Sequence, residues 1–409
     1  MHAALAAQQA RRLDDADRLY RAALAIAPDE PDALHMLGVV RYERGDFVEA
    51  RQLIIRALDL TGWGIAAFRH NLGLVIARQY EDRDRRAWET LQRDYRTWVE
   101  SRRQAWRRVA PRVTVVIPSY NHARFVGEAL KSLYGQTYRN VEVIVVDDGS
   151  LDGSAEIIAA VLRDCPFPHR FVVRENRGAA ATINEGIAFA TGEFVNVLNS
   201  DDRFSADRLE KLVDAIACVG GEWGFGGVTF VGSDGRPLDA LCHRRVFELT
   251  CALAAVPYRD SVGLAFLPAN VAVSSGNLFI ARRLVERVGG FRDYRYNHDW
   301  DFCLRAVMLA EPVFVPDPLY EYRLHDSNTI AESSALARAE GEGIGGEFLR
   351  AATEAGTASN PWAPTLSVWG PALLTSVLRS GMGAIMDARA IRVLALRAIE
   401  DAKTAPAAG

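Results

Sequence analysis

Residues 141–150 read Val-Glu-Val-Ile-Val-Val-Asp-Asp-Gly-Ser, an apolar run that ends in two acids and a turn. Two further stretches share this plan: residues 113–121 read Val-Thr-Val-Val-Ile-Pro-Ser-Tyr-Asn, and residues 193–202 read Glu-Phe-Val-Asn-Val-Leu-Asn-Ser-Asp-Asp. Runs of β-branched and apolar residues that precede helical patterns are typical of parallel strands buried on both faces. The three stretches therefore predict an α/β domain with a Rossmann-like, mostly parallel sheet.

The polar clusters fall where the predicted strands end. Ligands of open α/β sheets bind outside the carboxyl ends of the strands. These ends carry acids, amides and hydroxyls, and not the Gly-x-Gly-x-x-Gly pattern of a dinucleotide site. Carboxylates cannot cradle a phosphate directly, but they can hold a divalent cation that does. The pattern indicates a nucleoside diphosphate that is bound through a metal.

The clusters resemble the donor-binding loops of the inverting family 2 glycosyltransferases, which have the GT-A fold. The resemblance covers residues 112–330 and implies a nucleotide-sugar donor. It implies that the nucleoside is contacted by the first two loops, and that a further turn lies near the diphosphate. The residues concerned are Pro118, Ser119, Tyr120, Asn121 and Asp148, then Asn176 and Gly178.

The third cluster resembles the Asp-x-Asp loop of that family, which holds ribose, metal and diphosphate. It departs from the family at Asn199, where the first aspartate is usual, so the loop has lost one charge. The resemblance implies that Asn199 and Ser200 contact the donor and that Asp201 ligates Mg²⁺ or Mn²⁺. Two adjacent acids at a strand end repel each other unless a cation compensates, which favours a metal over a surface turn. Asp202 is alternatively a cap for a helix that starts near Ser205.

A second acidic motif, residues 297–302, reads Asn-His-Asp-Trp-Asp-Phe. It resembles the family motif at the start of a helix that lines the acceptor site, and His298 stands where glutamate is usual. The resemblance implies that Asp299 is the catalytic base. A hydroxyl acceptor needs such a group, because it attacks poorly unless a positioned carboxylate takes its proton. Capping of the helix by Asp299 is compatible with this role.

The sequence Tyr-Arg-Leu-His at residues 322–325 follows the last predicted strand, 312–320. Related transferases often end with an arginine-x-histidine element. The resemblance therefore implies that the imidazole of His325 joins Asp201 at the metal or the pyrophosphate. The alternative is an ordinary surface histidine.

The sequence outside this domain predicts helices. Residues 1–80 repeat with a period of 34, so that Ala16 and Tyr20 recur as Ala50 and Ile54, which is typical of tetratricopeptide repeats. Residues 81–111 predict a charged linker helix, and residues 331–409 predict a helical C-terminal region. The expected fold is thus a GT-A domain at 112–330 between an all-α repeat region and a helical tail.

Composition narrows the class of protein. A net charge of -4 and an isoelectric point near 6.1 argue against a nucleic-acid partner, whose phosphates require basic residues. Five cysteines without a Cys-x-x-Cys pair fit a reducing compartment. The N-terminus lacks a signal-peptide pattern, and proline interrupts the uncharged stretches. We expect a cytoplasmic chain, with peripheral contact at the inner face of a membrane left open.

Together these features predict an inverting glycosyltransferase that moves a sugar from a UDP- or dTDP-sugar to a hydroxyl. The repeats predict a protein or a growing glycan as acceptor, docked on them. Padding or a homo-oligomer contact is the alternative role of the repeats. The competing hypothesis is a catalytically impaired scaffold that acts through its repeats, and Asn199 and His298 favour it.

Overall fold

The computed structural model describes residues 1–325, 335–354, 356, 358–379 and 391–397. The chain divides into two units, one formed by Met1–Asp94, Gly341–Thr357 and Pro364–Gly409, and one formed by Tyr95–Glu340 and Ala358–Ala363. The second unit is therefore inserted in the sequence of the first. The borders expected at residues 80 and 111 stay predictions, and the one expected at 330 lies outside the described residues.

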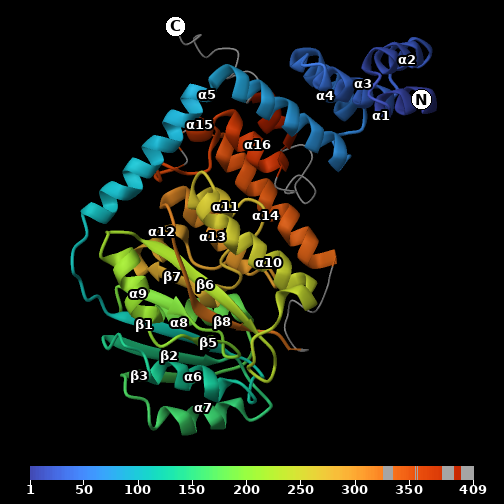
Figure 1. The fold of residues 1–409 in the computed structure, drawn as a ribbon. Helices are drawn as coiled ribbons and strands as arrows, with labels where there is room; N and C mark the ends of the chain where they lie inside the picture. The colour runs from blue at the N-terminus through green and yellow to red at the C-terminus, as the bar shows by residue number, and fades with distance from the viewer. Residues whose placement is uncertain (326–334, 355, 357, 380–390, 398–409) are drawn as a thin grey trace. The chain divides into compact units, whose positions relative to one another are not determined.

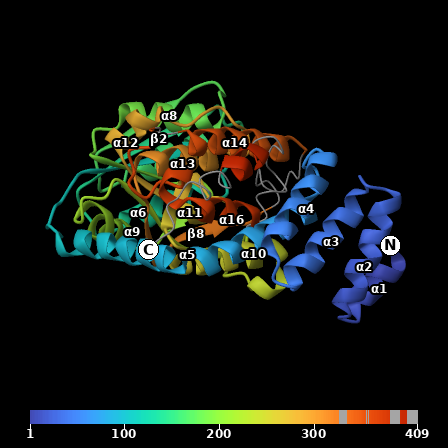
Figure 2. The same cartoon turned by 90° about the horizontal axis from the view of Figure 1, so that it is seen from above.

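The first unit begins with four helices in which each helix packs against the next (Figure 2). Their bounds are α1, His2–Gln9; α2, Leu13–Ile26; α3, Pro31–Glu43; and α4, Phe47–Leu60. The repeat positions Ala16, Tyr20, Ala50 and Ile54 are all fully buried. A Cβ atom on Gly38 would come within 2.6 Å of Ile54, so α3 and α4 approach closely because this position has no side chain. The small residues of the 34-residue period lie where the helices touch.

The remaining helices of the first unit come from both sides of the insertion. Helix α5, Ala66–Gln104, begins in this unit and runs on through the segment predicted as a linker. The C-terminal helices are α14, Ala335–Thr353; α15, Leu366–Trp369; and α16, Pro371–Arg379, with residues 391–397 also helical. Gly73 of α5 faces Leu378 of α16, and Arg392 pairs with Asp59 at 2.9 Å. The C-terminal helices thus belong with the repeats.

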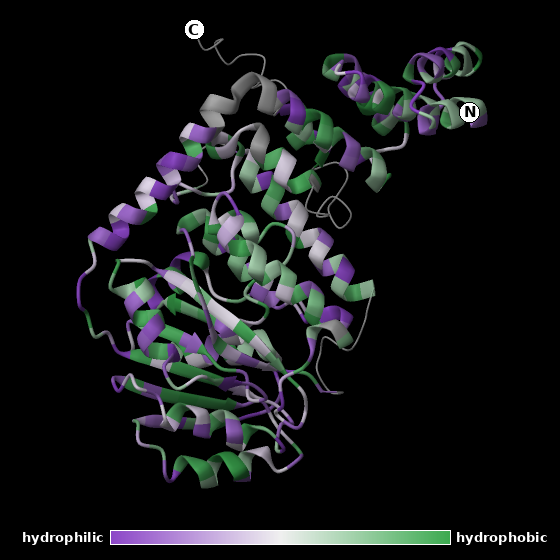
Figure 3. Cartoon of the chain, viewed as in Figure 1, coloured by the Kyte–Doolittle hydropathy of each residue, from purple (hydrophilic) through white to green (hydrophobic). Residues whose placement is uncertain are grey.

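The second unit contains one eight-stranded sheet with the order β3-β2-β1-β4-β7-β6-β8-β5 (Figure 1). The strands are β1, Val113–Ser119; β2, Val141–Asp147; β3, His169–Val173; β4, Phe194–Val197; β5, Arg203–Phe204; β6, Trp223–Val231; β7, Leu278–Ala281; and β8, Val313–Arg323. Strands β3, β2, β1 and β4 are parallel, whereas β7 is antiparallel to both β4 and β6. Figure 3 shows mostly hydrophobic colour along the sheet and hydrophilic colour along the last turns of α5.

Helices flank this sheet. They are α6, Val126–Tyr134; α7, Ser154–Leu162; α8, Ala179–Phe189; α9, Arg208–Leu212; α10, Arg244–Ala255; α11, Val262–Ala265; α12, Arg282–Val288; and α13, His298–Leu309. Helix α8 packs on β1 and β2, and a Cβ atom on Gly186 would collide with Val116. In the described part of the chain, no helix combines the length and apolarity needed to cross a bilayer.

A buried arginine joins the two halves of the sheet. Arg208 is fully buried and donates to Asn196 Oδ1 at 3.1 Å and to Asn277 Oδ1 at 3.0 Å. Asn277 in turn bonds the backbone of Gly226 through both its oxygen and its amide. The network fixes the turn before β7 against β4 and β6. This turn, residues 270–277, forms one wall of the site described next.

Candidate functional site

The loops that follow β1 and β2 are clasped together at the carboxyl edge of the sheet. The Asp147 carboxylate is fully buried and accepts hydrogen bonds from Ser119 Oγ at 3.1 Å and from Ser150 Oγ at 2.7 Å. Asn121, in the left-handed region with φ of 52°, accepts from the Leu151 N–H at 2.9 Å. The two loops therefore form one surface, on which Tyr120 is 46% exposed.

Asp148 faces away from Asp147 and holds the next loop. Its carboxylate accepts from the backbone N–H groups of Arg177 at 2.8 Å and Gly178 at 2.9 Å, and it also bonds the Arg174 guanidinium. Gly178 has φ of 88° and precedes α8, and Asn176 beside it is exposed. The structure thus brings the predicted residues Asp148, Asn176 and Gly178 together. A contact between Asp148 and a nucleoside stays a prediction.

The loop after β4 divides its two acids between different tasks. The buried Asp202 carboxylate accepts from the Tyr320 hydroxyl and from the Arg323 N–H at 2.7 Å. Burial, and then the neighbouring charge of Asp201, raise the pKa of Asp202. The suggestion that Asp202 caps a helix near Ser205 is wrong, because its oxygens bond β8 and the helix begins at Arg208.

Asn199 is used within the protein. Its amide donates to Ser274 Oγ at 2.7 Å and to Asp202 Oδ2 at 3.2 Å, and its oxygen accepts from Ser275 Oγ at 3.3 Å. These bonds tie the loop after β4 to the turn before β7. An amide suits this position because an aspartate could not donate to Ser274 or Asp202. Its predicted contact with the donor stays a prediction.

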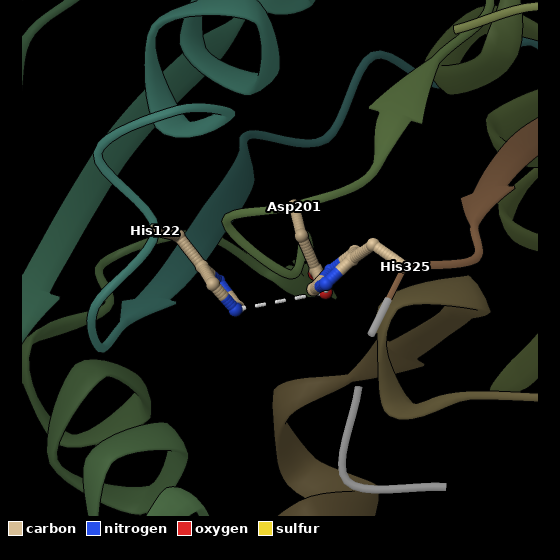
Figure 4. A group of neighbouring side chains, drawn as sticks. All are labelled: His122, Asp201 and His325. Atoms are coloured by element: carbon tan, nitrogen blue, oxygen red, sulfur yellow. Dashed lines mark hydrogen bonds and ion pairs between the residues drawn. The ribbon is translucent and has the colours of Figure 1, made fainter. Parts of the chain in front are cut away.

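Asp201 points the other way, toward two imidazoles that come from separate loops (Figure 4). His325 Nε2 lies 3.1 Å and His122 Nε2 lies 3.8 Å from Asp201 Oδ2. Within the described residues, these three form the group whose ligand atoms could hold a metal, all within 4.8 Å of one another. Burial raises the pKa of Asp201, but the hydrogen bond from His325 and the charges of both histidines outweigh it, so the pKa lies below its ordinary value.

Sequence reasoning brought Asp201 and His325 together and missed His122. His122 directly follows Asn121 in the first polar loop, so an imidazole adjoining a predicted site loop was the signal available. His122 Nδ1 is 2.7 Å from the hydroxyl of Ser200, a predicted donor contact.

Arg323 is the arginine of the arginine-x-histidine element, to which sequence reasoning assigned no role of its own, and it is only 1% exposed. Its Nε donates to the Asp201 carbonyl at 2.8 Å, and its guanidinium pairs with Glu128 at 2.8 Å and lies over Phe125. Its own N–H donates to the Asp202 carboxylate, so Arg323 holds the Asp201 main chain and the Asp202 side chain from β8. It positions the loop that presents Asp201.

Asp299 lies in the first turn of α13, and its carboxylate accepts from the Trp300 N–H at 2.7 Å. Burial raises the pKa of Asp299, and the charge of His298 acts in the opposite direction. Burial and the charges of Asp202, Asp201 and Asp299 together raise the pKa of the Tyr322 phenol.

Asp301, the other acid of this motif, has a different setting. It is 2% exposed and pairs with Arg305 at 2.5 Å and Arg292 at 3.4 Å. Trp300, by contrast, donates from its indole to the Phe266 carbonyl at 2.8 Å and anchors the start of α13 in the core. Asp301 serves a structural ion pair and is not oriented as an alternative base.

Comparison with known proteins agrees with these features. Residues 114–222 match the model of glycosyl transferase family 2, and residues 7–61 match a tetratricopeptide repeat model. An uncharacterised glycosyltransferase of Nostoc sp. is 24% identical over 238 residues, 58% of this chain and 72% of that protein. The succinoglycan biosynthesis protein ExoO of Rhizobium meliloti is 34% identical over 206 residues, 49% of this chain and 56% of that protein.

Among solved structures, the mannosyltransferase PcManGT of Pyrobaculum calidifontis, in complex with GDP-Man and Mn²⁺, is 19% identical with a TM-score of 0.46, covering 83% of this chain and 88% of that one. The sheet with its polar carboxyl edge makes the second unit an α/β domain whose strands β3, β2, β1 and β4 are parallel, as the sequence predicted. The chain carries a glycosyltransferase family 2 domain, preceded by tetratricopeptide repeats.

Proposed function

We propose that this protein is a metal-dependent inverting glycosyltransferase that moves a sugar from a nucleoside-diphosphate donor, a UDP- or dTDP-sugar, to a hydroxyl acceptor. The observation that carries the proposal is the placement of Asp201 with His325 at the carboxyl edge of the sheet, where His325 Nε2 lies 3.1 Å from Asp201 Oδ2. A direct displacement requires a site on the donor side that neutralises the departing diphosphate, and a base on the acceptor side.

The loops after β1 and β2 would hold the nucleoside. Tyr120 offers an exposed aromatic face, and the clasp between Asn121 and Leu151 keeps this face in place without a ligand. The turn at Asn176 and Gly178 would lie beside the diphosphate, because it opens α8 and a helix N-terminus favours a negative charge. A UDP- or dTDP-sugar fits this proposal, since uracil and thymine present the same hydrogen-bonding ring edge.

Asp201 and His325 would hold Mg²⁺ or Mn²⁺. Such a cation neutralises charge on the departing nucleoside diphosphate when it is bound. Carboxylate and imidazole are suitable ligands, and the low pKa of Asp201 keeps its carboxylate ionised at neutral pH. Arg323 would keep this carboxylate in register by its bond to the Asp201 carbonyl.

Asp299 would accept the proton of the acceptor hydroxyl. Burial raises the pKa of Asp299, which makes its carboxylate a stronger base than that of an exposed aspartate. The acceptor oxygen would attack the anomeric carbon on the face opposite the diphosphate, so the sugar would be inverted in one step. No covalent link between sugar and protein forms in such a displacement.

The acceptor is a protein or a growing glycan held by the repeats, in a cytoplasmic protein that contacts the inner face of a membrane at most peripherally. The repeats also offer a surface for a homo-oligomer. Leu34 and His35 of α3 are 1% and 6% exposed, so an acceptor groove along this helix would use other side chains. His35 instead stacks on Phe68 and bonds Asn71 within the first unit.

The test is to incubate the full-length protein, stripped of metal, with UDP- and dTDP-sugars and with Mg²⁺ or Mn²⁺, and to measure release of the nucleoside diphosphate. Release that requires added metal and disappears in Asp201→Ala supports the proposal. Absence of release with every donor, together with donor binding by thermal shift, would instead favour the scaffold, for which Asn199 and His298 argue. The anomeric configuration of the product, read by NMR, checks inversion.

A further inference from the structure

His122 is the third side chain of the group around Asp201, and no function has so far been given to it. We propose that His122, Asp201 and His325 form a ligand set of two imidazoles and one carboxylate, and that this set selects a transition metal such as Mn²⁺, Co²⁺ or Zn²⁺ over Mg²⁺. The inference rests on the proposed function for the role of the metal, but metal binding itself can be measured without donor or acceptor.

The orientation of His122 is the first support. Its Nδ1 lies 2.7 Å from Ser200 Oγ, and Ser200 is 1% exposed. When Ser200 accepts from Nδ1–H, the Nε2 lone pair is directed at Asp201, as Figure 4 shows for the ring. A histidine that binds a metal almost always donates its other N–H to a fixed acceptor. Ser200, next to Asp201 in the chain, provides that acceptor.

The rigidity of the group is the second support. The His325 ring lies 4.7 Å from the Phe125 ring, and the His122 and His325 rings meet edge to face at 5.7 Å. His325 also follows two residues after Arg323, whose backbone and side chain bond the loop that carries Asp201. Three strands, β1, β4 and β8, thus deliver one ligand each to the same point.

The distances fit a shared cation. Around a metal with bonds of about 2.1 Å, ligand atoms are separated by about 3–4 Å. The two Nε2 atoms lie 3.1 and 3.8 Å from Asp201 Oδ2, and all three ligand atoms lie within 4.8 Å of one another. Movements below about 1 Å would therefore place all three ligand atoms around one cation. Donor phosphates or water would fill the remaining coordination positions.

The charge of the site explains the choice of metal. Asn199 supplies no charge and is bonded to Ser274 and Ser275, while Asp202 is directed to Tyr320 and Arg323. Asp201 is therefore the carboxylate ligand of the group, and the other two protein ligands are the neutral imidazoles of His122 and His325. Mg²⁺ prefers an all-oxygen shell and keeps its water, whereas transition metals bind imidazole well. The neutral amide of Asn199 and the imidazole of His122 thus both favour a metal that accepts nitrogen ligands.

The experiment titrates the metal-free full-length protein with Co²⁺, without nucleotide, and follows the visible absorption of the bound ion. Wild type should bind one equivalent, which Mn²⁺ and Zn²⁺ displace and Mg²⁺ displaces only at far higher concentration. His122→Gln should weaken Co²⁺ by at least about tenfold, and Ser200→Ala by about 10–100-fold. His169→Gln, which changes a histidine of β3 outside the group, is the matched control and should bind as wild type.

The variant His122→Asp tests whether misfolding causes the loss of Co²⁺ affinity in His122→Gln. It should bind metal again but with its preference moved toward Mg²⁺, because an oxygen ligand replaces a nitrogen ligand. Co²⁺ affinity equal to wild type in His122→Gln, or Mg²⁺ competing on equal terms in wild type, would overturn the proposal. Metal binding that depends on His122 in a protein that turns over no nucleotide-sugar would leave this inference standing and refute the proposed function instead.

Discussion

The Tyr95 hydroxyl donates a hydrogen bond to the Glu311 carboxylate at 3.1 Å, which joins α5 to the start of β8. Glu311 also accepts from the Gly263 N–H at 3.0 Å and from Asn360 at 3.0 Å. These bonds favour the ionised form, but burial outweighs them and raises the pKa of Glu311 to about 7. A buried acid with this pKa makes the second unit sensitive to pH.

We predict that the stability of the second unit falls as the pH rises from about 4.5 to about 7. The folded chain holds the Glu311 proton more tightly than the unfolded chain does, so the contribution of the protonated carboxyl is complete at low pH and is lost through this window. The pKa difference corresponds to about 3 kcal/mol at most. Glu311→Gln should make the melting temperature nearly independent of pH between pH 5 and pH 8. Glu286→Gln, an exposed exchange, should keep the wild-type slope, and an equal slope in both variants would locate the effect elsewhere.

Asp201→Asn should abolish metal-dependent donor binding while the domain stays folded. The exchange removes the charge that faces His122 and His325, but it leaves the bond from Arg323 to the main-chain carbonyl intact. Calorimetric titration of a UDP-sugar with Mn²⁺ present, alongside a melting curve, measures both. Unchanged donor affinity in a folded variant would remove Asp201 from the site.

Asn199→Asp should raise metal affinity at the expense of stability. It restores the charge that the loop lacks, yet a carboxylate cannot donate to Ser274 and would stand beside the buried Asp202. Loss of a buried hydrogen bond and the new repulsion together cost about 1–3 kcal/mol. Co²⁺ titration should show a higher metal affinity than wild type, and thermal melting should show a lower melting temperature. A more stable variant would mean that the Asn199 bonds contribute little.

Asp299→Asn should leave donor binding intact and lower transfer by about 10²–10⁴-fold, since the amide cannot accept the acceptor proton. Asp301→Asn should instead lower stability by about 1–3 kcal/mol, because Arg305 and Arg292 would lose their buried partner. Single-turnover transfer rates and melting curves of both variants separate these roles. A loss below tenfold in Asp299→Asn, with chemistry rate-limiting, would assign the base to another group.

Removal of residues 1–60 should spare donor binding and slow donor hydrolysis while weakening transfer to a large acceptor. The deletion removes α1 to α4. It keeps α5, because Gly73 of this helix packs on Leu378 and α5 is needed to support the C-terminal helices of the first unit. Transfer to a small sugar alcohol serves as the internal control. Full transfer to the large acceptor would favour an oligomerisation role for the repeats.

Local sequence patterns predicted the parallel half of the sheet well. The runs at 113–117, 141–146 and 193–198 became β1, β2 and β4 to within two residues, because a strand buried on both faces must be apolar throughout. The same runs located the polar loops, since parallel strands end at one edge. The 34-residue period was equally readable, because the small residues of a repeat are required wherever helices touch.

The rest of the site depends on contacts between distant segments. His122 meets His325 across about half of the chain, and Arg323 reaches back to Glu128, so no local pattern specifies either pairing. Arg208 is buried and bonds two asparagines, with no carboxylate partner among the described residues, whereas charge patterning places arginine at the surface. Asn199 was predicted to contact the donor, and the bonds that it makes to Ser274 and Ser275 come from a turn that periodicity does not reveal.

The insertion of the second unit into the first has a consequence for synthesis on the ribosome. The repeats emerge first, but the helices that complete their unit, beginning at Gly341, follow only after the whole transferase domain. At typical elongation rates this interval is roughly 12–50 s. Throughout it, the side of α5 that later receives Leu378 is without its partner. The nascent chain therefore has an opportunity to fold its catalytic domain before its first domain can close, and a chaperone or a second nascent chain has time to occupy the open helix.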